Sequence, residues 1–351
     1  MQRREFMGRL GATAIAAVCG SSPGHAQTTG GAAHRKIVAN GIHLHFVEQG
    51  EGPPIVLLHG FPELWYSWRH QLAALSAAGF RAVAVDMRGY GQSDRPEAID
   101  QYTLLHLVGD ITGLLDALGI QQAVIAGHDW GAAVAWQAAL LRPDRFRAVI
   151  ALSLPHLQRS PVTPTLTMPR RKDSVFYILY FQQPGVAEAE LERDVRQTFL
   201  RVLGGSAAGA LRERFAGDPM GMVPRDGGWL ADRPLPAALP DWLTEADLDF
   251  YVGEFERTGF RGGLNWYRNI DRNWELLAPF DGAKVTVPAL YMVGDRDLIL
   301  AFPGMDRALV NLANNVPHLR GKVVLPGCGH WTQQERASEV NAAMIDFLRG
   351  L

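Results

Sequence analysis

The chain has 351 residues, of which 47% are hydrophobic and 20% are charged, a balance typical of a globular protein with a sizeable core. Its formal net charge of −2 gives no electrostatic reason to expect nucleic acid or an anionic membrane surface as a partner. Its two cysteines, Cys19 and Cys328, are too few for a disulfide framework or a cysteine-rich metal site. No pattern in the sequence indicates an oligomeric state.

The first 26 residues have the pattern of an export signal. Arginines at positions 3, 4 and 9 precede an apolar run at residues 10–18, and Gly-His-Ala at 24–26 resembles a cleavage site. The run is too short to span a bilayer as a helix, and “RREFM” at residues 3–7 resembles a twin-arginine signal. We therefore expect residues 1–26 to be a signal peptide and the mature protein to be periplasmic or secreted, by the twin-arginine or the general route. Residues 28–35 are expected to be a flexible lead-in.

Strand and helix patterns then alternate up to residue 156. Four short apolar runs are bounded by turn residues and suit strands that are buried on both faces: “PPIVLLHG”, “RAVAVDMRG”, “QAVIAGHDWG” and “AVIALSLP”. Between the first two runs, “ELWYSWRHQLAALSAAG” has helical spacing and stops at a glycine. This alternation predicts right-handed crossovers and a mostly parallel sheet with helices on both faces.

The pattern changes after residue 156. Residues 157–280 have helical patterns and no run typical of a buried strand, whereas strand patterns return in “VPALYMVGDRD” and “GKVVLPGCGHW”. A helical pattern closes the chain. The sequence therefore predicts an α/β core formed by residues 34–156 and 281–351, interrupted by a helical lid at residues 157–280.

The stretch “AVIAGHDWGAAVAW” joins a buried strand to a helix of small residues and holds Asp129 between Gly127 and Gly131. The pattern Gly-x-Asp-x-Gly has the form of the nucleophile elbow, a strained turn between a strand and a helix that normally presents a serine. Here a carboxylate takes the place of the serine. The sequence thus predicts an exposed, reactive aspartate at the end of a strand.

Asp297 and His330 also follow predicted strands. The carboxyl ends of parallel strands meet at one edge of a sheet, where ligands bind, so we expect these residues to lie near Asp129 under the lid. The chain order of nucleophile, acid and histidine is the one found in α/β hydrolases. It assigns Asp129 as the nucleophile, Asp297 as the orienting acid and His330 as the base, with Asp295 as a competing acid in the same turn.

An aspartate nucleophile can attack a different kind of carbon atom from the one that a serine attacks. A serine needs a base and attacks carbonyl carbon, whereas a carboxylate is already ionised near neutral pH and can displace a leaving group at saturated carbon. The product is an ester on Asp129, and His330 can then activate the water that hydrolyses it. The backbone N–H groups of Phe61 and Trp130 would form the oxyanion hole for that second step. His59, in the “LLHGFP” motif that holds Phe61, is expected to be structural.

Two leaving groups suit such a carboxylate, an epoxide oxygen and a halide. An opening epoxide becomes an alkoxide and needs a proton donor, whereas a halide needs only weak N–H donors. The predicted lid carries Tyr177 and Tyr267, and a phenol with a pKa of about 10 stays protonated at neutral pH and can donate. Tyrosines in such segments also often only pack against apolar neighbours, so the residues alone leave both interpretations open.

The elbow, “LYFQQPGVAEAELE”, “LNWYRN” and “GCGHWTQQE” resemble the epoxide hydrolase domain of the soluble epoxide hydrolases, from about Ile42 to the C-terminus. The resemblance implies an α/β-hydrolase fold with an inserted helical cap, and the hydrolysis of a small apolar epoxide by water to a vicinal diol without metal or organic cofactor. It implies Tyr177 and Tyr267 as paired acids above Asp129, and Asp297 with His330 as the water-activating pair. The residues that it places in the substrate pocket are Phe61, Trp130, Phe181, Ile299 and Trp331. The larger animal members also carry a phosphatase domain, and the export pattern here implies no such activity.

Two alternatives remain from the same motifs. Haloalkane and haloacid dehalogenases share the aspartate elbow, but many haloalkane enzymes have asparagine after the His-Gly pair, where this chain has Phe61. Fluoroacetate dehalogenases place arginines around the nucleophile, whereas here “WGAA” follows Asp129. A hydrolase-like binding protein that has lost catalysis need not keep the full charge system, and this chain keeps every member. These departures favour the epoxide hydrolase interpretation.

Overall fold

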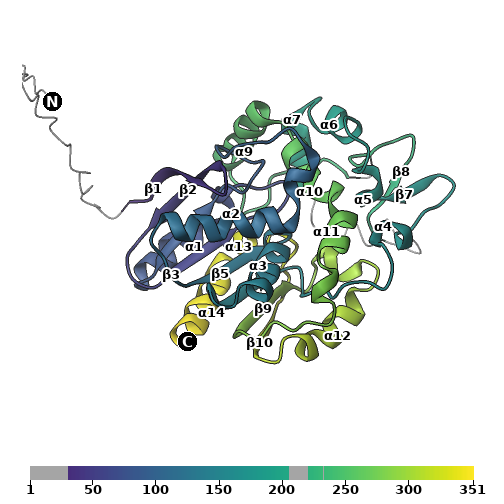
Figure 1. Ribbon diagram of the computed structural model, residues 1–351. Coiled ribbons are helices and arrows are strands. Elements are labelled where there is room, and N and C mark those ends of the chain that lie inside the picture. Colours follow the sequence, from purple (N-terminus) through teal and green to yellow (C-terminus); the bar gives the residue numbers. More distant parts are fainter. Residues whose placement is uncertain (1–30, 205–219, 232) are drawn as a thin grey trace, which may run out of the picture. The chain divides into compact units, whose positions relative to one another are not determined.

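An eight-stranded sheet forms the centre of the described chain. The computed structural model describes residues 31–204, 220–231 and 233–351, and the predicted signal peptide at 1–26 lies outside these residues. Within Ala32–Leu351, which form one compact unit, the strand order is β1-β2-β4-β3-β5-β6-β9-β10 (Figure 1). The strands are β1 (Ala33–Ala39), β2 (Ile42–Gln49), β3 (Pro54–Leu58), β4 (Arg81–Val85), β5 (Ala123–His128), β6 (Phe146–Leu152), β9 (Ala289–Gly294) and β10 (Leu319–Leu325). Among the described strands of this sheet, only the pairs β1–β2 and β2–β4 are antiparallel, so the mostly parallel sheet of the prediction is confirmed.

The apolar runs of the sequence become strands that are buried on both faces. In β3, Ile55 and Leu57 pack in one core cluster while Val56 and Leu58 pack in another, because successive side chains of a strand point to opposite faces. The first cluster includes helices α1 (Arg69–Ala77) and α14 (Ala337–Arg349), and the second includes α2 (Leu104–Ala117) and α3 (Trp130–Leu141). Helices therefore cover both faces, as predicted.

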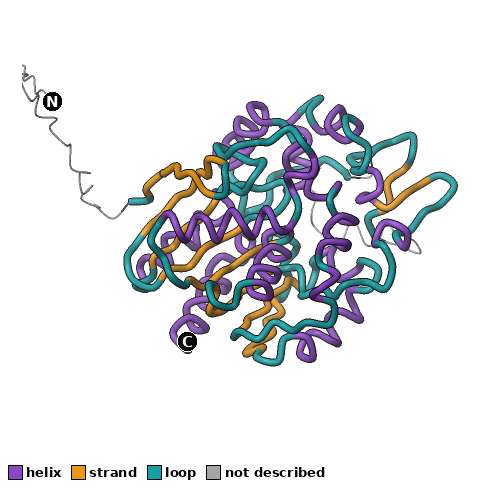
Figure 2. The backbone as a smooth tube through the Cα atoms, viewed as in Figure 1, coloured by secondary structure: helices purple, strands orange, loops and turns teal. Residues whose placement is uncertain are grey.

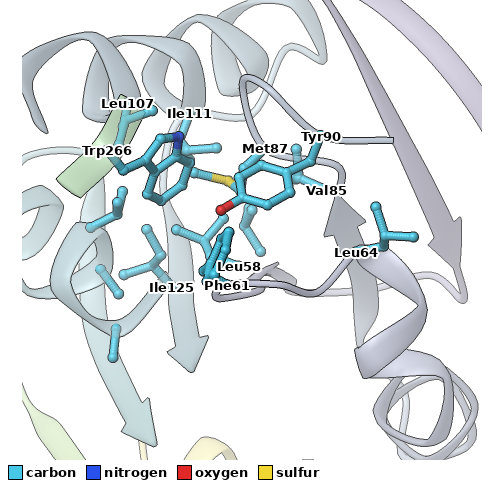
Figure 3. Packing of buried hydrophobic residues seen from close by; sticks show 14 of the residues in the cluster. Leu58, Phe61, Leu64, Val85, Met87, Tyr90, Leu107, Ile111, Ile125 and Trp266 are labelled. Atoms are coloured by element: carbon cyan, nitrogen blue, oxygen red, sulfur yellow. The ribbon is translucent and has the colours of Figure 1, made fainter. Parts of the chain in front are cut away.

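The segment between β6 and β9 shares the second cluster. Figure 3 shows Trp266, from α10 (Arg261–Arg268), beside Leu107 and Ile111 of α2. The Trp266 ring also meets Tyr90 edge-on at 5.5 Å, and its indole N–H donates to the Arg88 carbonyl at 3.1 Å. This packing joins the inserted segment to the sheet by a continuous apolar core.

The inserted segment is mostly helical but also contains strands. Its elements are α4 (Pro164–Thr167), β7 (Ser174–Phe176), α5 (Tyr177–Tyr180), α6 (Val186–Leu191), α7 (Val195–Phe199), the π-helical turn η3 (Leu200–Gly204), β8 (Met222–Pro224), α9 (Glu245–Thr258), α10, α11 (Ile270–Leu276) and η4 (Ala278–Phe280). Strands β7 and β8 pair antiparallel in a sheet of their own, apart from the main sheet (Figure 2). The expectation of a purely helical segment was wrong here, because three-residue strands are too short to show a period in the sequence.

A second correction concerns the stretch expected as a lead-in. Its last residues, from Ala33 to Arg35, belong to β1, which pairs with β2 through the register Ala33↔Glu48 to Ala39↔Ile42. The remaining elements are η1 (Trp65–Trp68), η2 (Ile99–Tyr102), η5 (Leu298–Ala301), α12 (Met305–Asn315) and α13 (Thr332–Glu335). In the described part of the chain, no helix has both the length and the apolar character needed to cross a membrane.

Candidate active site

Asp129 lies on a sharp turn between β5 and α3. Its backbone has φ 51° and ψ −119°, a conformation that costs a non-glycine residue about 1–3 kcal/mol. A Cβ atom at Gly131 would lie 2.1 Å from the Leu58 carbonyl oxygen, and one at Gly127 would lie 2.0 Å from the Gly131 carbonyl oxygen. Both glycines of the motif are therefore required by close backbone approach. The turn lifts the Asp129 side chain off the sheet edge, as the elbow pattern predicts.

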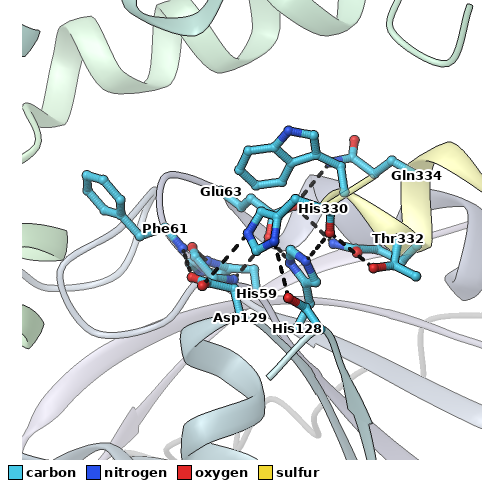
Figure 4. Close-up of polar contacts among 12 residues, drawn as sticks. His59, Phe61, Glu63, His128, Asp129, His330, Thr332 and Gln334 are labelled. Carbon is cyan, nitrogen blue, oxygen red and sulfur yellow. Dashed lines mark hydrogen bonds and ion pairs between the residues drawn. The ribbon is translucent and has the colours of Figure 1, made fainter. Parts of the chain in front are cut away.

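The loop after β3 lies directly against the Asp129 carboxylate. The Phe61 backbone N–H donates to Asp129 Oδ1 at 3.0 Å (Figure 4). A Cβ at Gly60 would meet the Asp129 Cβ at 2.5 Å, so only glycine allows this approach. Phe61 N–H, which makes this bond, is one of the two predicted oxyanion donors. The other, Trp130 N–H, lies at the start of α3, one residue after Asp129, and makes no hydrogen bond to the carboxylate among the described contacts.

His330 bridges the two carboxylates. Its Nδ1 is 2.9 Å from Asp297 Oδ1, and its Nε2 is 3.8 Å from Asp129 Oδ2. Asp297 is fully buried, whereas Asp295 is exposed and accepts from the Gly327 N–H at 2.8 Å instead. The geometry therefore favours Asp297 over the competing acid.

The side chains of Asp297 and His330 shift each other's pKa. Burial by itself lowers the pKa of His330, but the hydrogen-bonded Asp297 carboxylate and then the Asp129 carboxylate outweigh burial and raise that pKa to about 9. Burial by itself raises the pKa of Asp297, but the charge and hydrogen bond of His330 lower it below its ordinary value. His330 is thus a cation at neutral pH as long as both carboxylates are ionised.

Tyr177 and Tyr267 lie over the elbow, in the same cavity as Asp129 and His330. Tyr177 begins α5 and Tyr267 belongs to α10, and their ring centroids are 5.8 Å apart. Burial, and with it the negative charge of Asp129, raises the pKa of both phenols above the ordinary value. Both phenols consequently keep their protons at neutral pH and are available as donors in the cavity.

The predicted pocket residues divide into two layers. Phe61, Ile299 and Trp331 line the cavity. Phe181 and Trp130 do not line it, because each ring packs edge-on against the Tyr267 ring, with centroids 5.0 Å apart in both pairs. These two rings hold the Tyr267 phenol in place.

His59 has the structural role that was expected. Its ring Nε2 accepts from the Met87 N–H at 3.0 Å, so its Nδ1 donates to the Gly60 carbonyl at 2.8 Å. Complete burial lowers the pKa of His59 and favours this neutral form. Both ring nitrogens are therefore used in positioning the loop that carries Phe61. Among the described residues, no group of three or more His, Cys, Asp or Glu side chains is placed to hold a metal ion.

The chain is similar to known proteins in both sequence and structure. A family model for the α/β hydrolase fold matches residues 53–337. Epoxide hydrolase A of Mycobacterium tuberculosis is 48% identical over 329 residues, which cover 92% of this chain and 99% of that protein. The crystal structure of epoxide hydrolase A from Mycobacterium thermoresistibile is 48% identical with a TM-score of 0.84, and the alignment covers 92% of this chain and 99% of that one.

The chain belongs to the epoxide hydrolase family of the α/β hydrolases. Bifunctional epoxide hydrolase 2 of Sus scrofa is 42% identical over 313 residues, which cover 89% of this chain but 54% of that protein. The resemblance to the soluble epoxide hydrolases is therefore confirmed, and these relatives give no support to the dehalogenase alternative.

This epoxide hydrolase also has a buried polar network that the sequence did not reveal. Glu63 Oε2 lies 2.8 Å from His128 Nδ1, and His128 Nε2 donates to the His330 carbonyl at 2.7 Å (Figure 4). Glu63 also accepts from the Gly60 N–H at 3.1 Å and from the Gln333 and Gln334 side-chain amides at 2.9 and 3.0 Å. The network ties the Phe61 loop, the elbow and the His330 loop together.

Ser153 is another contact of the catalytic group that no motif indicated. It follows β6 at φ 71° and is fully buried, and its Oγ is 3.2 Å from His330 Nδ1. Its backbone is held by the Tyr291 hydroxyl, which donates to the Ser153 carbonyl at 2.7 Å. In this epoxide hydrolase the ring of His330 is therefore oriented by a hydroxyl as well as by Asp297.

Proposed function

We propose that the protein hydrolyses an organic epoxide to a vicinal diol through a covalent ester on Asp129. The observation that carries this proposal is one cavity lined by the Asp129 carboxylate, two protonated phenols and His330, which is paired with the buried Asp297 behind it. The names of the relatives, epoxide hydrolases from bacteria, plants and mammals, support the same reaction. The mostly apolar lining of the cavity supports an epoxide with an apolar body.

In the first step, the Asp129 carboxylate attacks one ring carbon and the carbon–oxygen bond of the epoxide breaks. One phenol, of Tyr177 or Tyr267, passes its proton to the departing oxygen while the other donates a hydrogen bond to it. Donors that are already oriented in a site from which water is excluded stabilise developing charge without reorganisation. The step leaves a hydroxyalkyl ester on Asp129 and one tyrosinate.

In the second step, a water attacks the ester carbonyl of Asp129. Ester formation removes the charge of Asp129, one of the negative charges that raise the pKa of His330, so the His330 cation releases its proton to solvent and the neutral imidazole is available as a base. His330 takes the proton of the water and returns it to the departing diol oxygen, while the Phe61 and Trp130 N–H groups hold the oxyanion. The Asp129 carboxylic acid then loses its proton to restore the tyrosine, and the cycle closes.

Replacing either phenol is expected to slow the first step, and replacing both is expected to slow it much further. Tyr177→Phe and Tyr267→Phe should each lower kcat about 10²-fold, and the double variant should have no measurable ring opening. Tyr90→Phe is a matched control, because the Tyr90 hydroxyl is buried and has no hydrogen-bond partner among the described residues. Unchanged kinetics in the double variant would rule out the phenols as acids.

A substrate panel tests the reaction class itself. Styrene oxide and an aliphatic epoxide should give diols without added metal or cofactor, whereas 1-chlorobutane and fluoroacetate should release no halide. Gas chromatography of the diol and ion chromatography of the halide measure the two outcomes. Halide release at a rate comparable with diol formation would replace the proposal with dehalogenation.

Two further inferences concern the organisation of the chain and its export. We infer that residues 157–280 act as a cap over a core of residues 34–156 and 281–351, since Tyr177, Tyr267 and Asp129 of these segments line one cavity. We also infer that residues 1–26 direct export to the periplasm or beyond, on the arginine pair and the apolar run of the sequence. N-terminal sequencing of the protein from the periplasmic fraction tests the second inference, because an uncleaved cytoplasmic protein contradicts it.

A further inference from the structure

The loop that carries His330 is bound by one side-chain carboxylate, that of Glu335. Glu335 Oε2 accepts from the Gly329 N–H at 2.6 Å, and Glu335 Oε1 accepts from the Trp331 N–H at 2.9 Å. A single carboxylate therefore holds the backbone of the residues on either side of His330. Glu335 has no function in the reaction steps described above.

Glu335 is placed for these two contacts by the short helix that follows His330. It is the last residue of α13 (Thr332–Glu335), and its own backbone N–H donates to the Trp331 carbonyl at 2.8 Å. Its side chain is half-buried and turns back from this helix onto the loop. Both of its oxygens accept a hydrogen bond, which is the pattern of an ionised carboxylate.

The carbonyl of His330 is held by other groups. It accepts from His128 Nε2 at 2.7 Å, from the Thr332 N–H at 2.8 Å and from the Thr332 hydroxyl at 3.0 Å. The loop also lies against the end of β9, because a Cβ atom at Gly294 would lie 2.3 Å from the Cys328 carbonyl oxygen. These contacts fix the carbonyl of the histidine, whereas the neighbouring N–H groups are held by the carboxylate.

The position of the His330 ring matters most in the second step of the proposed reaction. Its Nδ1 is 2.9 Å from Asp297 Oδ1, and its Nε2 is 3.8 Å from Asp129 Oδ2. The attacking water must lie within hydrogen-bond reach of Nε2 and next to the ester carbonyl of Asp129. A displacement of about 1 Å in such a geometry can cost about 10²-fold in rate. Ring opening uses the Asp129 carboxylate and the phenols, so it depends less on this ring.

We propose that Glu335 is a positioning residue, whose carboxylate fixes the backbone on both sides of His330 so that the imidazole can activate the water that hydrolyses the ester. The inference rests on the proposed epoxide hydrolase function and adds a residue to its second step. The side chain of glutamine has one acceptor oxygen and one NH₂ donor, so Glu335→Gln would turn a donor toward one of the two backbone N–H groups. The substitution keeps the size of the side chain and removes one of the two hydrogen bonds.

The test measures the two chemical steps separately after rapid mixing with styrene oxide. Epoxide consumption in the first turnover gives the rate of ring opening, and the decay of the ester in the mass spectrum of the quenched protein gives the rate of ester hydrolysis. Glu335→Gln should slow ester hydrolysis about 10- to 100-fold and leave ring opening within about twofold of the wild-type rate, so that the ester accumulates. In the His330→Gln background, the same substitution should slow ester hydrolysis less than about twofold further, since a positioning residue acts through the histidine.

Glu339→Gln controls for the loss of a nearby negative charge, because Glu339 is exposed on α14, 3.9 Å from Arg336, and should keep both rates. If Glu335→Gln does not fold, Glu335→Asp, which keeps both acceptor oxygens on a shorter side chain, should show the same selective loss to a smaller degree. The inference is overturned by wild-type ester hydrolysis in the folded variant, by equal losses in both steps, or by a further loss in the His330→Gln background. Failure of the proposed function is distinguishable, since the wild-type enzyme would then form neither the ester nor the diol.

Discussion

Asp129→Asn is expected to lower kcat for epoxide hydrolysis by about 10⁴-fold or more, the largest effect of any single substitution in this chain. The asparagine keeps the shape of the side chain and can still accept from the Phe61 N–H, which now lies 3.0 Å from Asp129 Oδ1. It removes only the negative charge that attacks carbon. Diol formation from styrene oxide, measured on freshly purified protein, gives the result.

Two controls separate chemistry from folding in that experiment. Asp295→Asn changes an exposed carboxylate that faces the Gly327 N–H, and its kcat should stay within about twofold of the wild-type value. Asp129→Ala removes the carboxylate without leaving an amide that water could hydrolyse back. Wild-type turnover in Asp129→Ala with an unchanged melting temperature would contradict the assigned nucleophile.

His330→Gln is expected to separate the two steps. The Asp129 carboxylate and both phenols remain, so the ring opens once, but no base activates the water and kcat falls about 10²- to 10⁴-fold. Rapid mixing should therefore show one equivalent of epoxide consumed per enzyme with little diol released. The exposed His318→Gln is the matched control and should turn over normally. Loss of epoxide consumption together with diol release would show that His330 is needed before the ester forms.

Much of the core could be predicted because its signals are local. The runs in β3, β4, β5 and β6 are apolar throughout, as strands buried on both faces must be, and turn residues bound them. Gly127 and Gly131 mark the elbow because the backbones around them approach too closely for any side chain. Since parallel strands end at one edge, the positions of Asp129, Asp297 and His330 after three strands were enough to predict that they meet.

The other residues around the site are brought together by contacts between distant parts of the sequence, which no local pattern encodes. Ser153 follows β6 and His330 follows β10, and the two side chains meet across the end of β9, which lies between these strands, with the Ser153 backbone at a positive φ. Glu63 and His128 pair across 65 positions of the sequence. Arg233 lies in a proline-rich loop without periodicity, so its place in the cavity appears only in the folded chain. Contacts of this kind follow from tertiary packing and not from motifs.

In the proposed reaction a side-chain carboxylate, and not a water molecule, bonds to the epoxide carbon. The most direct measurement is the mass spectrum of a proteolytic digest of His330→Gln after reaction with excess styrene oxide. The peptide containing Asp129 should gain the mass of one epoxide, and this gain should disappear in the double variant Asp129→Asn/His330→Gln. Diol formation with an unmodified Asp129 peptide throughout, or a stable adduct on another residue, would contradict this reaction.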